Sequence, residues 1–397
     1  MKRFNLLILI LALMLAFTVP AFAQGDCGDL SAEDCDILYG SSDAMMDVVS
    51  GSQYIGVEVQ AMNVPQTPIT DSSFAWTLDT TYSYTDDAVS AAMAMQEMSA
   101  EEMAALYADP AALTDMVVTV LSGMSASIDM TTDFSDELVG LIAANGGGQF
   151  PSSVVLSVVM DGGIAYLDLG TLEPLLGDAG MGGMTGWIGI DVIPWVEASL
   201  MQSSADPNTA LAASVSTQAG AGPLYTQIAG VDMGMVTPFL NIARGEDTEV
   251  DGEAAASFVT TIDWQAFVDS PYFDQLIGLA LSQSGAMPSD AEMEQTITLA
   301  KMFGPALLEG IVVELVENVG LDSGYLLSTD FTFDWNLSDL AALSAMAGGA
   351  ALEVDDNAAI MASIVTTNSS VNEDVTVEVP ADAFIIPTEM LTGAMGQ

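Results

Sequence analysis

The residue types that usually carry catalysis are scarce in this chain. Its 397 residues contain no histidine and only two cysteines, Cys27 and Cys35. The lack of histidine excludes Ser-His-Asp and Cys-His arrangements and every metal motif that needs an imidazole. No P-loop is present, and the glycines at 180–183 do not lie between a strand and a helix, as in a dinucleotide-binding fingerprint. We therefore expect a protein that is not an enzyme and has no cofactor and no dedicated metal site.

Acidic residues are the remaining groups that could do chemistry. Adjacent pairs occur at Glu101-Glu102, Asp136-Glu137 and Asp355-Asp356, and such pairs could bind calcium or act in acid/base catalysis. With 55 acidic residues, however, adjacent pairs arise by chance, and no run fits an EF-hand loop. A solvated acidic surface is the favoured interpretation, and a hydrolase that uses two carboxylates is the less favoured one.

Basic residues and methionines each allow two interpretations. Arg244 and Lys301 are the only basic residues beyond the first three positions, and Arg244 could either hold the anionic head of a ligand or relieve repulsion between carboxylates. The 25 methionines suit an adaptable binding surface or ordinary core filling. Copper binding by the methionines at 93–103 is disfavoured, because their spacing favours one face of an amphipathic helix.

The N-terminus has the pattern of a secretory signal peptide. Met1-Lys2-Arg3 precedes an apolar run from Phe4 to Val19, and Ala21-Phe22-Ala23 forms an A-x-A cleavage site. An uncleaved anchor is the alternative. No other apolar stretch approaches the roughly 20 residues that a membrane span needs. We therefore expect residues 1–23 to be removed and residues 24–397 to fold outside the cytoplasm, secreted or in the periplasm or at the cell surface, without spanning the membrane.

In an exported chain, the two cysteines are expected to form a disulfide. Cys27 and Cys35 would close a small loop near the new N-terminus, and a loop this short stabilises a fold only modestly. A thiol-based site is the alternative, but no histidine is present to activate either sulfur.

The charge of the chain limits its partners. The sequence has 55 acidic and 4 basic residues, so the net charge is −53 once Lys2 and Arg3 are removed. This charge disfavours nucleic acid and anionic lipid surfaces as partners. Salt or divalent cations would screen the self-repulsion. Hydrophobic residues make up 51% of the chain, which predicts a folded core rather than disorder.

Alternation of apolar and polar residues predicts a series of strands. The sharpest signal is a hairpin around Asp161-Gly162-Gly163, and a second turn is expected at Val250-Asp251-Gly252. We expect strands over 55–61, 76–84, 124–130, 154–160, 164–169, 187–192, 255–264, 311–316, 325–335, 360–367 and 375–379.

Helical patterns interrupt these strands. Helices are expected over 30–49, from 194 onward, over 237–244, 265–283 and 289–303, and as a pair within 88–123 that breaks near Asp109-Pro110. Few strands alternate one-for-one with helices, which disfavours a doubly wound parallel sheet. We therefore predict an α+β fold with one large curved antiparallel sheet, a half barrel, and helices packed on its concave face. Residues 24–397 form one domain, with a helical insertion at about 88–123.

Four features follow one another along the chain between Asp161 and Pro380. They are the hairpin Asp161–Tyr166, the Trp-led strand Gly186–Asp191, the acidic turn at 250–252 with the strand that follows it to Asp263, and the final segment Val371–Pro380. Together with a signal peptide and an N-terminal helix, this pattern resembles the lipoprotein-carrier fold of LolA, LolB and the mycobacterial LppX and LprG lipid carriers. The chain departs from that family in its length, its insertion, its few basic residues and the absence of a lipobox.

The resemblance implies an open barrel whose helices enclose an apolar cavity for acyl chains. We therefore predict a carrier or sensor that binds a hydrophobic small molecule or lipid. The alternative is an acidic secreted surface or structural protein that binds divalent cations or a cell-envelope partner. Aromatic residues on the strands are either cavity wall or ordinary core. The candidate wall residues are Trp76, Tyr82, Tyr84, Tyr166, Trp187, Phe331, Phe333 and Trp335.

Overall fold

The computed structural model describes most of the chain between Cys27 and Ile386. The described residues are 27, 30–65, 67, 69–96, 98–144, 151–171, 186–203, 239–283, 290–308, 310–338 and 354–386. The expected signal peptide at 1–23 and the glycine-rich segment at 180–183 lie outside this set.

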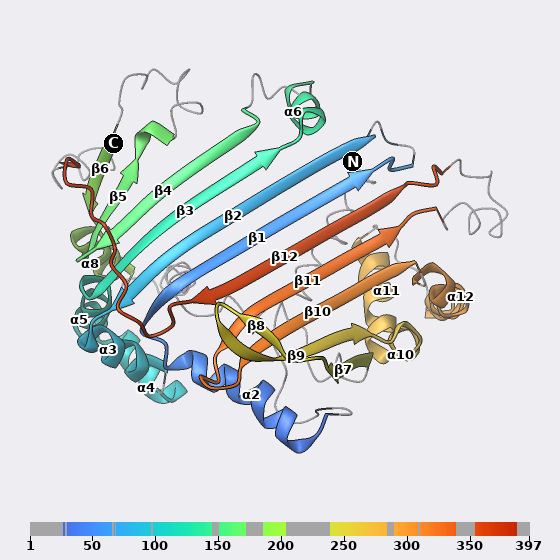
Figure 1. Ribbon diagram of the computed structural model, residues 1–397, viewed down its shortest axis with the longest axis horizontal. Helices are drawn as coiled ribbons and strands as arrows, with labels where there is room; N and C mark the ends of the chain where they lie inside the picture. The colour runs from blue at the N-terminus through green and yellow to red at the C-terminus, as the bar shows by residue number, and fades with distance from the viewer. Residues whose placement is uncertain are drawn as a thin grey trace.

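Thirteen strands form a single sheet that curves without closing into a barrel (Figure 1). In chain order they are β1 (Ser50–Met62), β2 (Asp71–Tyr84), β3 (Met124–Phe134), β4 (Ser153–Asp161), β5 (Ile164–Asp168), β6 (Trp187–Asp191), β7 (Leu240–Arg244), β8 (Thr248–Val250), β9 (Glu253–Ile262), β10 (Ile311–Gly320), β11 (Leu326–Asn336), β12 (Ala359–Ser369) and β13 (Phe384–Ile386). The spatial order is β13-β6-β5-β4-β3-β2-β1-β12-β11-β10-β9-β7, and β8 also pairs with β9. The expected α+β class with a large curved sheet is confirmed.

The first strand of the chain lies beside a late one in the middle of the sheet. β1 pairs antiparallel with both β2 and β12, so strands from opposite ends of the sequence are neighbours. The backbone N–H of Val49 donates to Asn372 Oδ1 at 2.7 Å, although the two residues are 323 positions apart. After β12 the chain crosses to the far edge, where β13 pairs in parallel with β6. β1–β6 thus form one half of the sheet and β9–β12 with β7 form the other.

The strand register places apolar residues on one face of the sheet and polar residues on the other. Directly paired residues share a face, and successive residues alternate between faces. On the face we call the apolar face, one row across the sheet reads Leu315, Phe331, Ile364, Val57, Trp76, Thr132 and Val154. On the opposite face, called the polar face, a matching row reads Tyr54, Asp79, Asp129 and Ser157.

The helices lie between strands, and several begin at residues that cap them. They are α2 (Ala32–Met46), α3 (Asp86–Gln96), α4 (Ala100–Ala108), α5 (Pro110–Ser122), α6 (Asp136–Ile142), α8 (Ile193–Ser203), α10 (Trp264–Asp269), α11 (Pro271–Gln283) and α12 (Asp290–Leu308). Ser99 and Glu102 form a capping box at the start of α4. Asp109 caps α5 with Pro110 at its first turn, so the chain breaks there as expected.

Helices pack against the apolar face in the half formed by β7 and β9–β12. Leu38 of α2 is buried against Phe258 and Val319 of this face. Phe267 and Val268 of α10 are buried beside Leu240 and Ile262, in a cluster that includes residues of α11 and α12. Figure 1 shows α10–α12 beside β9 and β10, and α3–α5 with α8 beside the ends of β2–β6. The sheet and these helices therefore form two layers around the buried core.

Three expectations about the elements are wrong. The segment 88–123 was expected to hold a pair of helices, but it contains three, α3, α4 and α5, because Ser99 caps a further helix start. The segment 237–244 was expected to be helical, but Leu240–Arg244 is strand β7, because it completes a ladder with β9. The segment 375–379 was expected to be a strand, but it is irregular, and it has no ladder partner among the described residues. Its alternation still reflects burial, since Val375 and Val377 are half-buried while Thr376 and Glu378 are exposed.

In the described ranges no single helix is long and apolar enough to cross a membrane, although α4 and α5 together meet the length and composition as a pair bent by 100°.

Candidate functional site

The apolar face differs between the two halves of the sheet. In β9–β12 its side chains are closely packed: Phe331 and Phe333 are 1% and 7% exposed within a cluster that includes Val313, Leu315 and Ala362. In β1–β4 most of its apolar side chains are only half-buried. We call this part the open apolar face, and its central residues are Ile55, Val57, Trp76, Leu78, Ile128, Met130, Leu156 and Val158.

The eight aromatic residues predicted from the sequence do not share one environment. Trp76, Tyr82 and Tyr84 alternate along β2 and lie on the open apolar face or its border. Phe331, Phe333 and Trp335 lie on the same face of the sheet, but within or against the packed cluster of β9–β12. The structure therefore brings six of the eight onto one face and divides them between an open region and a packed one.

Tyr166 and Trp187 lie on the polar face instead. Tyr166 is paired with Val159 and Gly189, and Trp187 is paired with Asp168, all on that side of the sheet. The ring of Tyr166 lies over Gly189, where an added Cβ would be 3.2 Å from it. These two residues therefore cannot form one wall with Trp76.

Tyr82 and Tyr84 form a pair at the end of β2. Their ring centroids are 6.1 Å apart. Burial raises the pKa of Tyr82, and burial together with the neighbouring Tyr82 raises the pKa of Tyr84 to about 12. Both hydroxyls therefore remain protonated and uncharged at neutral pH.

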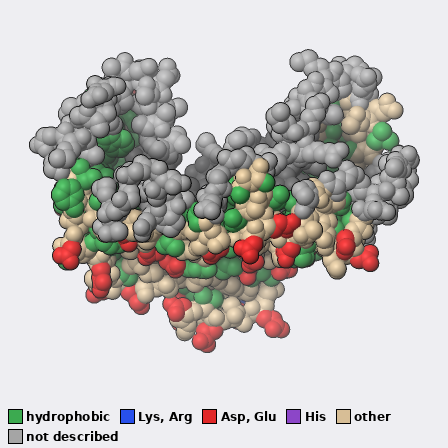
Figure 2. Space-filling view, turned by 90° about the horizontal axis from the view of Figure 1, so that it is seen from above, with side chains coloured by type: hydrophobic (Ala, Val, Ile, Leu, Met, Phe, Trp, Pro, Cys, Tyr) green, Lys and Arg blue, Asp and Glu red, His purple; other side chains and the backbone are tan. Residues whose placement is uncertain are grey.

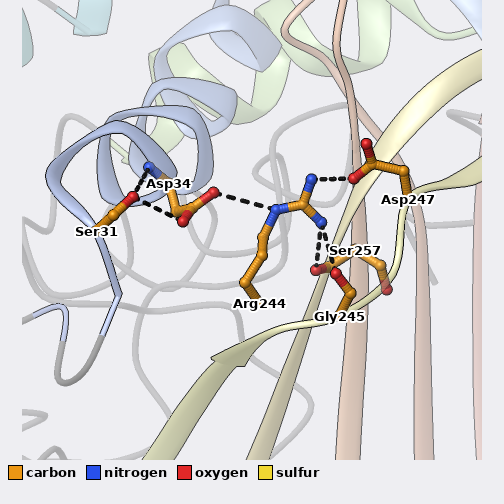
Figure 3. Close-up of polar contacts among 6 residues, drawn as sticks. All are labelled: Ser31, Asp34, Arg244, Gly245, Asp247 and Ser257. Carbon is orange, nitrogen blue, oxygen red and sulfur yellow. Dashed lines mark hydrogen bonds and ion pairs between the residues drawn. The ribbon is translucent and has the colours of Figure 1, made fainter.

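Arg244 holds the fold together rather than pointing to a ligand (Figure 3). Its Nε donates to Asp34 Oδ1 of α2 at 3.1 Å, and Nη2 is paired with Asp247. Nη1 donates to the carbonyl oxygens of Gly245 and Ser257 at 3.1 and 3.0 Å. The guanidinium carbon lies 5.2 Å from the centroid of the Phe258 ring. Such multiple charge-assisted bonds clamp α2 to the edge of the sheet.

Lys301, the second basic residue, also forms an ion pair within the fold. Lys301 Nζ of α12 lies 2.7 Å from Asp274 Oδ1 of α11. Both basic residues in the described part of the chain therefore tie a helix in place, and both are paired with carboxylates.

The predicted disulfide is confirmed, because Cys27 and Cys35 are bonded. Cys35 lies in the first turns of α2, beside the Asp34 that Arg244 binds. The disulfide and the arginine therefore fix the same end of α2.

One member of each of two acidic pairs, Glu102 and Glu137, has a structural role that its hydrogen bonds define. Glu102 closes the capping box of α4, and its hydrogen bonds with Ser99 lower its pKa. Glu137 of α6 accepts the backbone N–H groups of Thr70 and Asp71, at 3.0 and 2.6 Å, and these bonds lower its pKa. Within the described ranges, no group of three or more Asp, Glu, Cys or His side chains could hold a metal ion.

One buried carboxyl group was missed by the sequence analysis. Glu317 of β10 is 2% exposed, lies on the apolar face between Phe258 and Thr329, and has no hydrogen-bond partner for Oε2 among the described residues. Burial raises its pKa to about 7. The alternation of β10 could have revealed it, because Glu317 follows Val313 and Leu315 at every second position and therefore lies on the same face.

A set of uncharged polar residues on the apolar face was missed as well. Gln53 of β1 is paired with Thr80 of β2 on one side and Asn368 of β12 on the other. Gln53 continues the series Ile55, Val57 and Val59 of the same strand, so its place on the apolar face followed from the alternation.

Comparisons with known proteins give structural likeness only. No protein-family model matches the chain, and no curated protein matches it. LprF from Mycobacterium bovis is 11% identical over 89% of this chain and 100% of its own, with a TM-score of 0.30. LppX from Mycobacterium tuberculosis, a lipoprotein, is 12% identical over 88% of this chain and 100% of its own, with a TM-score of 0.27. LppX is also one of the proteins whose fold the sequence pattern resembles.

Proposed function

We propose that this protein is an exported, non-enzymatic carrier or sensor that binds a hydrophobic ligand, a lipid or acyl chain, between its sheet and its helices. The observation that carries the proposal is the open apolar face, where a row of apolar side chains is only half-buried beside a closely packed half of the same sheet. Contiguous apolar surface that stays partly accessible to solvent is typical of sites of interaction. Trp76, Tyr82 and Tyr84 are its proposed aromatic wall.

Binding would need no ionic contact. Each methylene group removed from water contributes about 0.8 kcal/mol, so a long acyl chain laid along the open apolar face gains affinity from burial alone. The disulfide between Cys27 and Cys35 supports an extracytoplasmic location, since such bonds persist in oxidising compartments.

Two tryptophans on opposite faces allow a direct test. The uncharged fluorescent hydrocarbon diphenylhexatriene serves as the probe, and its affinity is measured for the wild type, Trp76→Ala and Trp187→Ala. Trp76→Ala is expected to weaken binding by roughly tenfold, because a large apolar contact is lost. Trp187→Ala is the matched control and is expected to bind as the wild type does. Absence of probe binding by the folded wild type, or an equal loss in both variants, would refute the proposal.

A second candidate function is an acidic surface protein that binds divalent cations or a cell-envelope partner. It is favoured by the polar face, where the exposed residues Asp79 and Asp129 are directly opposite each other on β2 and β3. Like charges in this position repel, and a bound cation would relieve the repulsion. Asp and Glu side chains gather along one long side of the molecule in Figure 2.

A further inference from the structure

One end of the open apolar face carries polar side chains that have no charge. Gln53 is directly paired with Thr80 and with Asn368, and Tyr82 and Tyr84 follow Thr80 on the same face of β2. We call these five residues the polar end. Cross-strand partners have their Cβ atoms within about 5.5 Å of each other, so the polar end is a contiguous group.

Hydrogen bonds within the sheet orient the amide of Gln53. Asn368 Nδ2 donates to the carbonyl oxygen of Leu326 at 2.8 Å, and Gln53 Nε2 donates to Asn368 Oδ1 at 3.0 Å. Among the described residues, Gln53 Oε1 and the hydroxyls of Thr80, Tyr82 and Tyr84 have no side-chain hydrogen-bond partner. These atoms supply acceptors and donors to a polar group placed above them.

The opposite end of the same strands is aromatic and apolar. Phe74 of β2 and Phe134 of β3 lie on this face with ring centroids 5.6 Å apart, and Trp76 is two residues from Phe74. The six residue-to-residue steps from Thr80 to Phe74 span about 20 Å along the strand. This distance exceeds the roughly 15 Å that one leaflet contributes to the hydrocarbon core of a bilayer. The face is thus long enough for an acyl chain whose polar group lies at Thr80.

Neither basic residue of the described part of the chain is available for an anionic head group. Arg244 lies on β7 at the far edge of the sheet and is bound to Asp34 of α2 and to Asp247, and Lys301 is bound to Asp274. A phosphate at the polar end would meet only uncharged groups, in a protein with 55 acidic residues. A buried anion without a cationic partner is strongly disfavoured.

We propose that the ligand is a neutral amphiphile, a lipid with an ester, amide or hydroxyl head group, whose head group binds Gln53, Thr80 and the two tyrosines while its hydrocarbon lies toward Trp76 and Phe74. This inference rests on the proposed function and names the ligand class for the same face.

The test compares two probes that differ by one phosphate. Monopalmitoylglycerol and palmitoyl lysophosphatidic acid are each titrated into the full mature chain by native mass spectrometry and by displacement of diphenylhexatriene, at low and at high salt. The neutral lipid is expected to bind at least about tenfold more tightly at both salt concentrations. Equal affinities at high salt would overturn the inference, because the preference at low salt would then come from the net charge of the whole protein.

Substitutions test whether the polar end causes the preference for the neutral lipid. Gln53→Leu and Thr80→Val are each expected to weaken monopalmitoylglycerol binding by roughly 3- to 10-fold, the worth of a hydrogen bond, without weakening hexadecane binding. Thr77→Val, on the polar face of β2, is the matched control and changes neither. Gln53→Lys is expected to favour the phosphate-bearing lipid.

The outcomes separate the two proposals. If hexadecane binds but Gln53→Leu and Thr80→Val leave monopalmitoylglycerol binding unchanged, the head-group inference fails while the carrier proposal stands. If the folded protein binds neither hexadecane nor monopalmitoylglycerol nor diphenylhexatriene, the carrier proposal itself fails.

Discussion

At the residue scale, burial acts most strongly on the carboxyl group of Glu317. Its pKa is raised from 4.5 to about 7 because the side chain lies inside the packed half of the apolar face. The unfolded chain releases this proton near pH 4.5, whereas the folded chain keeps it until about pH 7. The unfolded state is therefore favoured increasingly as the pH rises between these values, and the stability that protonated Glu317 allows is lost in that interval.

Replacing this carboxyl group should remove part of the pH dependence. A shift of this size corresponds to about 3 kcal/mol, so the wild type should lose that much more unfolding free energy than Glu317→Gln between pH 4.5 and pH 8. Urea denaturation at several pH values measures the difference. Glu314→Gln, at an exposed position of the polar face on the same strand, is the control and should follow the wild type. Parallel curves for the wild type and Glu317→Gln would contradict the assignment.

At the element scale, the two ends of the α3–α5 segment are in close contact at Gly123. A Cβ at this position would collide with Thr85 Oγ1 and would lie 2.6 Å from the Cβ of Ala88. Gly123 follows α5 and precedes β3, whereas Thr85 and Ala88 lie at the start of α3. A methyl group here would push α3 and α5 apart.

Two glycine substitutions test this contact. Gly123→Ala is expected to lower the unfolding free energy by about 1–3 kcal/mol through overpacking. Gly140→Ala in α6, where no heavy atom lies within 4 Å of an added Cβ, should be neutral or stabilise by up to about 1 kcal/mol. Thermal or urea unfolding measures both. An unchanged stability in Gly123→Ala would show that α3 and α5 are not held together at this point.

The sequence predicts elements better than it predicts faces. Alternation within one strand was enough to place Trp76, Tyr82 and Tyr84 together. Tyr166 and Trp187 were grouped with them wrongly, because their face depends on the register carried through β2, β3, β4 and β5. The packing of Phe331 and Phe333 depends on neighbouring strands and on helices that pair with them only in the fold. Pairing with β9, which lies outside the local sequence pattern, also explains why 240–244 is a strand rather than the expected helix.

At the scale of the whole molecule, the net charge governs stability. The folded chain concentrates 55 carboxylates with few cations, so screening should stabilise the compact state. We expect the melting temperature to rise as sodium chloride is added at neutral pH. Calcium chloride at equal ionic strength should add little if screening is the only effect. A large additional stabilisation by calcium would instead favour the cation-binding alternative, and a falling melting temperature in sodium chloride would contradict the role of self-repulsion.

The central claim is that the open apolar face binds a neutral lipid. The most direct measurement is native mass spectrometry of the mature protein purified from the organism that makes it, followed by organic extraction of whatever is bound. The account predicts close to one lipid per chain, with an uncharged head group in the extract. A bare chain mass that stays unchanged when monopalmitoylglycerol and hexadecane are offered would contradict it and would favour the acidic surface protein.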